Sequence, residues 1–487
     1  MKKIVLPLLL LVSVRIFGQT TPDGNGPLDG GLRNREQLLS AALRGNSGYL
    51  LAASRGREAQ AQLAAAKAVR LPVVRFSSNL SYLTNPPSLT IKTGSLYPGG
   101  NIPIPIPNAS ATPQFPFPAL PGQDVTFNLT RNTNYEFGLT LEQPIFTWGR
   151  IHNSIKAAGL GHQASALQLE QEKRNIKTAL DSHLFTLAFL TEIRGLLAEQ
   201  RRSAERLIAI SEESYANGFL LKADLLSARL LSAEVRMGDY GITETWDNSF
   251  LAIKTITNLP DLTPSHLLLP SIPAPEAYGE GLSGESSGFS LGGREELLAQ
   301  LSAGNMNIKL LSLQTQVRER TVAAAKGQFY GKPELGLFLQ LTYSGPSFPF
   351  IQSGWKDDNK LNFTTTLGIR SLIFDGGGLY QSIRQKEEAL TQARLEEEKG
   401  RRDLEEYLEK TLRQLEVSRY RQEYLALKIE AAQAQKDQAE TAWKSGYGEE
   451  RVYLSQELSW YRDRIALLQE ELTALLIALQ LENVLGR

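Results

Sequence analysis

Two long stretches without proline constrain this chain more than any other feature. Residues 149–217 and 377–445 are equal in length, and neither contains a proline. In the first stretch, leucine and isoleucine recur every three or four positions from Ile176 to Leu197, which is typical of a coiled coil. A helix of this length would run about 100 Å at about 1.5 Å per residue. Because no ordinary globular domain accommodates such a helix, the chain must fold around helical rods.

The two stretches belong to two copies of one plan. Four features recur at one constant offset: Arg35-Glu36, Leu38-Leu39, Asn46 and Lys67 match Arg294-Glu295, Leu297-Leu298, Asn305 and Lys326. Six others recur at a second, shorter offset: Ile145, Phe146, Gly149, Ser154, Ile155 and Gly218 match Ile373, Phe374, Gly377, Ser382, Ile383 and Gly446. We therefore expect a first repeat over residues 19–259 and a second over residues 294–487. Residues 260–293, rich in Pro, Gly and Ser, read as a linker or surface insert.

The shorter second offset means that the first repeat carries about 30 extra residues. They lie in residues 84–124, which hold ten of the 23 prolines and only two charged residues, Lys92 and Asp124. This proline density argues against a helix or an interior strand. The segment is a disordered linker or a long surface loop between two strands, and the strand patterns that flank it favour the loop.

Four segments alternate polar and apolar residues with the period of a β-strand. Their apolar positions are Val74, Phe76, Leu80 and Tyr82; Tyr135, Phe137, Leu139 and Leu141; Leu335, Leu337, Leu339, Leu341 and Tyr343; and Phe363, Leu367 and Ile369. Each segment is about ten residues long, the length of a tilted strand that crosses a bilayer. A soluble sandwich would alternate in the same way, so periodicity leaves both readings open.

Most of the remaining chain is predicted to be helical. Opening helices are expected at residues 33–70 and 292–327, and each long helix should end at a glycine, Gly218 or Gly446, which suits a left-handed C-terminal turn. Return helices of about 40 residues then run to about Leu259 and Asn483. Two short helices placed end to end span about the length of one long helix, so each repeat can form a two-stranded rod.

The N-terminal segment, residues 1–18, has the order of a secretory signal. Lys2 and Lys3 precede an apolar run from Ile4 to Val14, which is too short to match the roughly 20 residues that span a bilayer. We therefore expect residues 1–18 to be an export signal. The chain has no cysteine, which excludes disulfides, thiolate sites and a lipidated cysteine anchor.

No constellation of residues suggests catalysis. The four histidines, His152, His162, His183 and His266, include no pair spaced three or four apart, so no metal site is indicated on a helix. Basic and acidic residues are balanced at 52 each, which leaves no electrostatic footprint for nucleic acid. We expect no enzyme activity, cofactor or nucleic-acid partner.

The strands point instead to an assembled conduit. Four strands cannot close a barrel, for which about eight is the practical minimum, and lipid does not tolerate an open sheet edge. Three copies would supply twelve strands and, below them, a wall of long helices closed by cyclic symmetry.

Two segments resemble the TolC-type outer-membrane efflux proteins: residues 139–158, LTLEQPIFTWGRIHNSIKAA, and residues 215–229, YANGFLLKADLLSAR. The resemblance, which covers nearly the whole chain after the signal, implies a mixed α/β homotrimeric channel. Its twelve-stranded β-barrel would lie in outer-membrane lipid and continue as a helical barrel in the periplasm. A periplasmic adaptor protein and an inner-membrane transporter would be its partners in the efflux of small molecules.

The resemblance also implies roles for the turns that end the long helices. Their tip residues would contact the adaptor: Gly218, Phe219 and Leu220, and Gly446, Tyr447 and Gly448. Asp224 matches an acidic position of the family, whereas Val452 stands where an aspartate is common and Gly448 where some members carry a gate arginine. The nearby charges Glu449, Glu450 and Arg451 are therefore, with Asp224, the gate candidates.

Two alternatives remain open at this point. Within the same family, the protein would be the outlet of a type I protein secretion system. From another class, it would be a periplasmic coiled-coil scaffold without a channel, in which case the four strands would be soluble.

Overall fold

The computed structural model describes residues 33–92, 100–103, 107, 112–117, 124–129, 131–273 and 291–486. The predicted signal at residues 1–18 lies outside these ranges, as do residues 274–290 of the predicted linker. The chain forms two compact units, each assembled from separate segments. The first comprises the described parts of residues 1–50, 173–288 and 411–483, and the second those of residues 51–172, 289–410 and 484–487.

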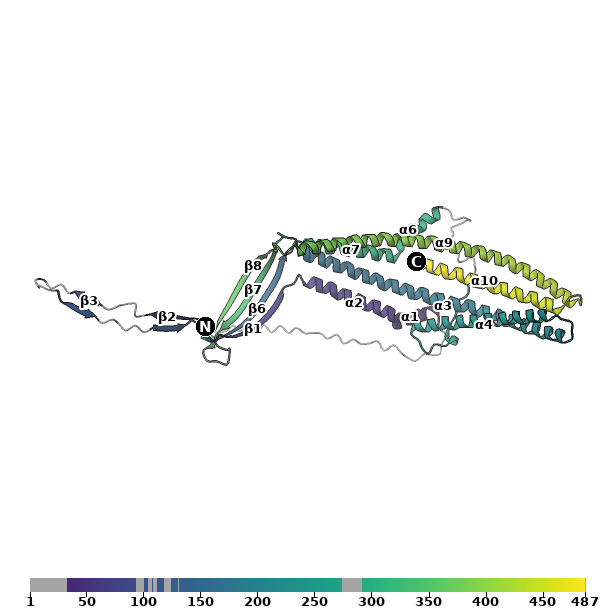
Figure 1. The fold of residues 1–487 in the computed structure, drawn as a ribbon, viewed down its shortest axis with the longest axis horizontal. Coiled ribbons are helices and arrows are strands. Elements are labelled where there is room, and N and C mark those ends of the chain that lie inside the picture. Colours follow the sequence, from purple (N-terminus) through teal and green to yellow (C-terminus); the bar gives the residue numbers. More distant parts are fainter. Residues whose placement is uncertain are drawn as a thin grey trace. The chain divides into compact units, whose positions relative to one another are not determined.

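The long helices and their return helices confirm the repeat. Helices α3 (Arg150–Ala216) and α9 (Gly378–Lys444) are equal in length, and so are α4 (Lys222–Thr257) and α10 (Glu450–Leu485) (Figure 1). Every end of α3 and α4 has its counterpart in α9 and α10 at the constant offset that relates Gly218 to Gly446. Within the described ranges, no helix combines the length and the apolar character needed to cross a membrane.

Each opening helix is divided in two, so the prediction of single helices over residues 33–70 and 292–327 is wrong. The first consists of α1 (Arg35–Gly45) and α2 (Ser47–Ala68), and the second of α6 (Leu291–Gly304) and α7 (Met306–Lys326). Asn46 and Asn305 lie at the breaks. Asn46 Oδ1 accepts hydrogen bonds from the amides of Gly48 (2.9 Å) and Tyr49 (3.2 Å), and Asn305 Oδ1 accepts one from the amide of Ile308 (3.1 Å). Each asparagine thus caps a new helix instead of continuing the old one.

The same two asparagines hold the ends of the return helices. Asn46 Nδ2 donates to the carbonyl of Ile256 (3.2 Å), and Asn305 Nδ2 donates to the carbonyl of Val484 (2.8 Å). Ile256 and Val484 are themselves equivalent positions of the two return helices. Each repeat therefore contains an asparagine clasp between the break in its opening helices and the end of its return helix.

The four predicted strands are confirmed and form one antiparallel sheet. Its strands are β1 (Val73–Tyr82), β6 (Thr133–Phe146), β7 (Glu334–Gly345) and β8 (Lys360–Arg370), in the spatial order β1-β6-β7-β8 (Figure 1). In the described part of the chain, the outer edges of β1 and β8 pair with no further strand. A one-turn helix, α8 (Trp355–Asp358), lies in the β7–β8 connection.

The proline-rich segment contains short strands that the sequence did not predict. In its described parts, β2 (Ser88–Lys92) pairs with β5 (Asp124–Asn128), and β3 (Gly100–Pro103) pairs with β4 (Gln114–Phe117). Both are two-stranded ribbons, in which every strand is an edge strand. Proline is tolerated at an edge because its missing N–H can face solvent, so Pro103 and Pro116 fit in β3 and β4.

Helix α3 provides the core of the first unit. The predicted seam residues of α3, Leu180 to Leu197 at every third or fourth position, are at most 4% exposed. One cluster joins the α3 residues Leu180, Leu184 and Leu187 to Leu38 of α1 and Ile253 of α4. A second joins Phe189, Leu190, Ile193 and Leu197 to Ile465, Leu468 and Leu475 of α10. Helix α3 therefore packs against both return helices.

Candidate functional site: a two-faced sheet and two hairpin tips

One face of the four-stranded sheet is apolar on every strand. In the register of the sheet, one row on this face consists of Phe76, Leu139, Leu341 and Phe363. The adjacent row on the opposite face consists of Arg75, Thr140, Gln340 and Thr364. Phe76 and Phe363 are 70% and 67% exposed in the single chain. Such a surface requires an apolar environment on one side and water on the other.

The polar face carries charge as well as hydroxyl and amide groups. Arg75 of β1 and Glu142 of β6 lie on this face, and Arg75 Nη1 is 2.8 Å from Glu142 Oε2. Both side chains are substantially exposed, so the pair is solvated and contributes little to stability. Its position indicates that water contacts this face.

Aromatic side chains gather at both ends of the sheet. At one end Tyr135 lies edge-on to Phe348, with ring centroids 5.0 Å apart. At the other, Phe146 lies edge-on to Trp148 at 5.1 Å, and the Trp148 indole donates to the carbonyl of Pro333 (2.8 Å). Tyr135 and Phe146 are eleven positions apart, about 25 Å along the normal for a strand tilted by about 45°. This matches the apolar band of about 25 Å, flanked by aromatic girdles, of outer-membrane barrels.

The first hairpin tip, between α3 and α4, is a tight C-terminal turn. Gly218 has φ +77°, its amide donates to the carbonyl of Tyr215 (3.0 Å), and the amide of Phe219 donates to the carbonyl of Ser214 (2.9 Å). These two bonds define a Schellman motif, in which glycine takes the left-handed conformation without steric cost.

The second tip, between α9 and α10, repeats this geometry. Gly446 has φ +76°, its amide donates to the carbonyl of Trp443 (3.0 Å), and the amide of Tyr447 donates to the carbonyl of Ala442 (3.0 Å). Gly448 also donates to Ala442, and a Cβ on Gly448 would lie 3.0 Å from that of Ala442. The predicted left-handed glycine turns are confirmed at both tips.

Each tip presents an aromatic side chain to solvent. Phe219 is 86% exposed and Tyr447 is 94% exposed, while Leu220 is half-buried and Leu221 is exposed. The residue that follows the glycine of a Schellman motif commonly packs back on the last helical turn. Here both aromatic rings are almost fully exposed in the single chain, which leaves them available to another molecule.

Three of the four gate candidates lie together on the second hairpin. Arg451 pairs with Glu449 (3.0 Å), and Glu450 accepts both Nε (2.9 Å) and Nη2 (3.1 Å) of Arg206 from α3. The hydrogen bonds that Arg206 donates to Glu450 raise the pKa of Arg206 above its ordinary value. Asp224 is exposed in the first turn of α4 and forms no ion pair with the described residues. Sequence reasoning missed Arg206, because its partner lies far away along the chain.

A second ion pair lies beside the first tip. Arg229 of α4 pairs with Glu212 of α3 (2.7 Å), and both line a cavity of about 360 Å³ together with Tyr215, Lys222, Leu225 and Leu226. Among the described residues, no group of three potential metal ligands occurs. The tips therefore combine exposed aromatic rings with charges suited to contacts with protein or ions.

Two apolar stripes on the helical hairpins are exposed in the single chain. On α4 the stripe consists of Leu226, Leu230, Ala233, Met237 and Tyr240, and on α9 it consists of Val417, Tyr420, Tyr424, Leu427, Ala431 and Ala434. Both follow the alternating three- and four-residue spacing of a coiled-coil seam. Tyr240 and Tyr424 lie at equal sequence distances from the glycines of their own tips, Gly218 and Gly446. Met237 and Leu427 also lie at equal distances from these glycines. The stripes therefore match in level if α4 and α9 run antiparallel.

Comparison with known proteins agrees with this geometry. Residues 38–259 match the model of the outer membrane efflux protein family. A comparison with curated proteins finds no match. The structure of CusC, described as forming a transmembrane channel, aligns with a TM-score of 0.69 at 15% identity, covering 93% of this chain and 92% of that chain.

Two further solved structures align over most of the chain. VceC, an outer membrane protein of Vibrio cholerae, aligns with a TM-score of 0.66 at 15% identity, covering 93% of this chain and 96% of that chain. The MtrE outer membrane channel of Neisseria gonorrhoeae aligns with a TM-score of 0.62 at 18% identity, covering 93% and 88%. At these identities the likeness shows the fold, and it confirms the predicted class of four strands continued by long helices.

Proposed function

We propose that this chain, in which residues 38–259 match the model of the outer membrane efflux protein family, is the exit channel of a tripartite efflux system. It resides in the outer membrane and extends into the periplasm. In this role it receives small molecules from an inner-membrane transporter and a periplasmic adaptor and releases them outside the cell. The observation that carries the proposal is the two-faced sheet with two open edges, joined to long hairpins with exposed aromatic tips.

We propose that a homotrimer closes the open edges of the sheet. The outer edges of β1 and β8 present unpaired backbone groups, which outer-membrane lipid does not tolerate. Edge-to-edge pairing of β8 with β1 of the next copy closes a ring of twelve strands when three chains contribute four each. The row that contains Phe76 and Phe363 then faces lipid, and the row that contains Arg75 faces the aqueous lumen.

The exposed helical stripes provide a second contact between copies. Helix α3 already packs against α4 and α10 within the chain, whereas the stripes on α4 and α9 remain exposed. Packing α4 of one copy against α9 of the next buries both stripes, with Met237 level with Leu427 and Leu230 level with Ala434. Because the two stripes differ, the contact is heterologous and closes as a ring by cyclic symmetry.

The tips are the proposed contact with the adaptor protein. Gly218, Phe219 and Leu220 form one tip and Gly446, Tyr447 and Gly448 the other, and each presents one almost fully exposed aromatic ring. Aromatic side chains are enriched in the cores of protein interfaces. The Schellman turns fix the backbone that carries both rings, so that little backbone entropy is lost on docking.

The proposed gate lies next to these tips. In a trimer, Asp224, Glu449, Glu450 and Arg451 each occur three times around the axis, and rings of carboxylates favour cations. The proposed closed state draws on the charged contacts that join Arg206 to Glu450 and Arg451 to Glu449.

The test combines assembly, conductance and export. Native mass measurement in detergent should give three chains, and the trimer should conduct in planar bilayers. Deleting the gene from its host should increase sensitivity to small toxic compounds.

Replacing both tip rings in one variant, Phe219→Asp together with Tyr447→Asp, should abolish export and leave trimer and conductance intact. A stable monomer that retains its strand content contradicts the channel. An outlet for protein secretion is the alternative, and it predicts loss of a secreted protein with unchanged sensitivity to small molecules.

A further inference from the structure

The ribbon formed by β2 and β5 has two chemically different faces. On one face Leu89 pairs with Phe127 and Ile91 pairs with Val125, and all four side chains are exposed in the single chain. On the other face the hydroxyls of Thr90 and Thr126 are hydrogen-bonded at 3.0 Å. A single two-stranded ribbon with an uncovered apolar face is only marginally stable in water, so a second surface is needed to cover it.

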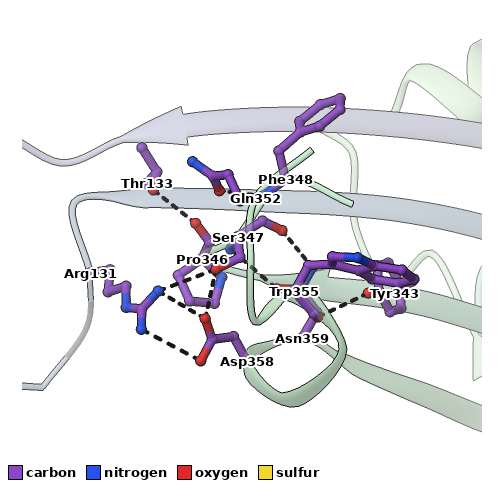
Figure 2. Close-up of polar contacts among 10 residues, drawn as sticks. All are labelled: Arg131, Thr133, Tyr343, Pro346, Ser347, Phe348, Gln352, Trp355, Asp358 and Asn359. Carbon is purple, nitrogen blue, oxygen red and sulfur yellow. Dashed lines mark hydrogen bonds and ion pairs between the residues drawn. The ribbon is translucent and has the colours of Figure 1, made fainter. Parts of the chain in front are cut away.

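The base of this ribbon, residues 131–133, forms hydrogen bonds and an ion pair with the β7–β8 connection. Residues 131–133 lead from β5 into β6, and Figure 2 shows Arg131 and Thr133 directed at that connection. Arg131 Nη1 donates to Asp358 Oδ2 (2.8 Å) and to Ser347 Oγ (3.2 Å), and Thr133 Oγ1 donates to the carbonyl of Pro346 (2.9 Å). Asn132 Nδ2 also donates to the carbonyl of Leu83, which directly follows β1 (3.0 Å). The ribbon therefore leaves the sheet from an anchored base.

The connection that receives these bonds is itself ordered by buried polar contacts. Asn359, 6% exposed, exchanges two hydrogen bonds with the backbone of Ser347, 2% exposed, at 3.2 and 2.6 Å. The Ser347 hydroxyl donates to Asp358 (2.7 Å), and Trp355 packs beside Tyr343 (Figure 2). The Arg131 ion pair thus joins the segment at the base of the ribbon to the β7–β8 connection.

We propose that the apolar face of this ribbon, Leu89, Ile91, Val125 and Phe127, packs against the same face of the two neighbouring copies above the barrel. This inference rests on the trimer of the proposed function, from which three ribbons emerge on one ring. A ring of twelve strands spaced about 4.8 Å apart and tilted by about 40° has a radius of about 12 Å. Strand β2, Ser88–Lys92, extends about 17 Å at about 3.3 Å per residue. A ribbon that leans inward from its base therefore reaches the axis.

Charge also favours a second copy as the occupant. Residues 84–124 contain only Lys92 and Asp124 as charged residues, and these two lie opposite each other at the same level of the ribbon. Three ribbons that meet at the axis therefore bring together no net charge, and nothing electrostatic keeps them apart. The contact forms an apolar collar at the extracellular mouth of the channel.

Because the chain lacks cysteine, single cysteines can test this contact without background. Leu89→Cys and Phe127→Cys should yield covalent dimers with a short bis-maleimide in intact outer membranes. Thr90→Cys and Thr126→Cys, the matched controls on the polar face, should yield at least tenfold less. Arg131→Ala should lower the yield from Leu89→Cys severalfold, because the base of the ribbon loses its bonds to Asp358 and Ser347.

Other outcomes separate this inference from the proposed function. Equal cross-linking from both faces, or none from Leu89→Cys in a protein whose native mass is trimeric, overturns the collar and leaves the channel. A fluorophore on Cys at position 89 that is quenched by spin-labelled lipid identifies lipid as the occupant and also overturns it. Failure to find a trimer contradicts the proposed function itself.

Discussion

The sheet offers a sharp test of which face contacts lipid, by placing arginine at either of two adjacent positions of β7. Leu341 lies between Leu139 and Phe363 in the apolar row, at the middle of the sheet. Gln340 lies between Thr140 and Thr364 in the polar row. Leu341→Arg and Gln340→Arg therefore place the same charge at the same depth, on opposite faces of one strand.

The expected difference follows from the depth of these residues. Arginine on the lipid face at the midplane of a barrel costs about 2–4 kcal/mol, whereas a residue facing the lumen remains in water. Gln340→Arg should change the free energy of unfolding by no more than about 0.5 kcal/mol. The two variants should thus differ by about 2–4 kcal/mol, or about 30- to 1000-fold in the folding equilibrium.

The assay is urea unfolding of each variant from lipid vesicles, followed by tryptophan fluorescence, with trimer content measured on the same samples. Leu341→Arg should shift the midpoint to lower urea, and Gln340→Arg should keep the midpoint of the parent. If both variants lose the same stability, or if Gln340→Arg loses more, the assignment of the two faces is wrong.

Three further predictions concern the helices. Asn46→Ala and Asn305→Ala should each lower the free energy of unfolding in denaturant by about 2 kcal/mol. Each substitution removes a helix cap worth about 1 kcal/mol and leaves a carbonyl without its donor, which costs about 1 kcal/mol. Asp at either position should restore only the cap. Burial lowers the pKa of His183 below its ordinary 6.5. Because the unfolded chain therefore binds the proton more tightly, stability should fall as the pH drops through about 6.5. His183→Gln should remove this difference between melting curves recorded at pH 7.5 and 5.5. In planar bilayers, Asp224→Ala should weaken cation selectivity and Arg451→Ala should raise conductance at low salt, where screening is least; unchanged values for both exclude these residues from the gate.

The long helices could be predicted from sequence because local signals agree along their whole length. Regular apolar spacing, absence of proline and a terminal glycine all point to the same ends at Gly218 and Gly446. Because the sequence is duplicated, each helix end could be predicted from either copy of the repeat. The observed helix ends keep the offset of the sequence repeat. The strands were also predictable, since each alternates over its length with one apolar face.

The remaining features depend on contacts between distant segments. An asparagine inside a helical pattern costs only a few tenths of a kcal/mol, so the sequence around Asn46 and Asn305 reads as continuous helix. Their bonds to Ile256 and Val484, which lie far away along the chain, accompany the breaks. The β2–β5 ribbon was hidden for a similar reason, because its two strands are short and a proline-rich segment separates them in the sequence.

The ion pair between Arg206 and Glu450 has no counterpart in the second copy of the repeat, and this asymmetry leads to a last prediction. Arg206 and Glu450 join α3 to α10 within one chain, but their repeat equivalents are Ala434 and Lys222, which cannot form an ion pair. In the proposed ring, the seam within a chain is therefore held by charge, and the seam between α4 and α9 of neighbouring copies by the apolar stripes. Arg206→Ala should raise conductance relative to the parent at about 0.1 M salt by freeing the α10 end of the seam. Near 1 M salt, where the Debye length falls to about 3 Å, that ratio should approach one. Arg202→Ala, which removes a pair with Glu199 on the same helix, should show no such change, and a ratio for Arg206→Ala that is independent of salt would refute the electrostatic lock.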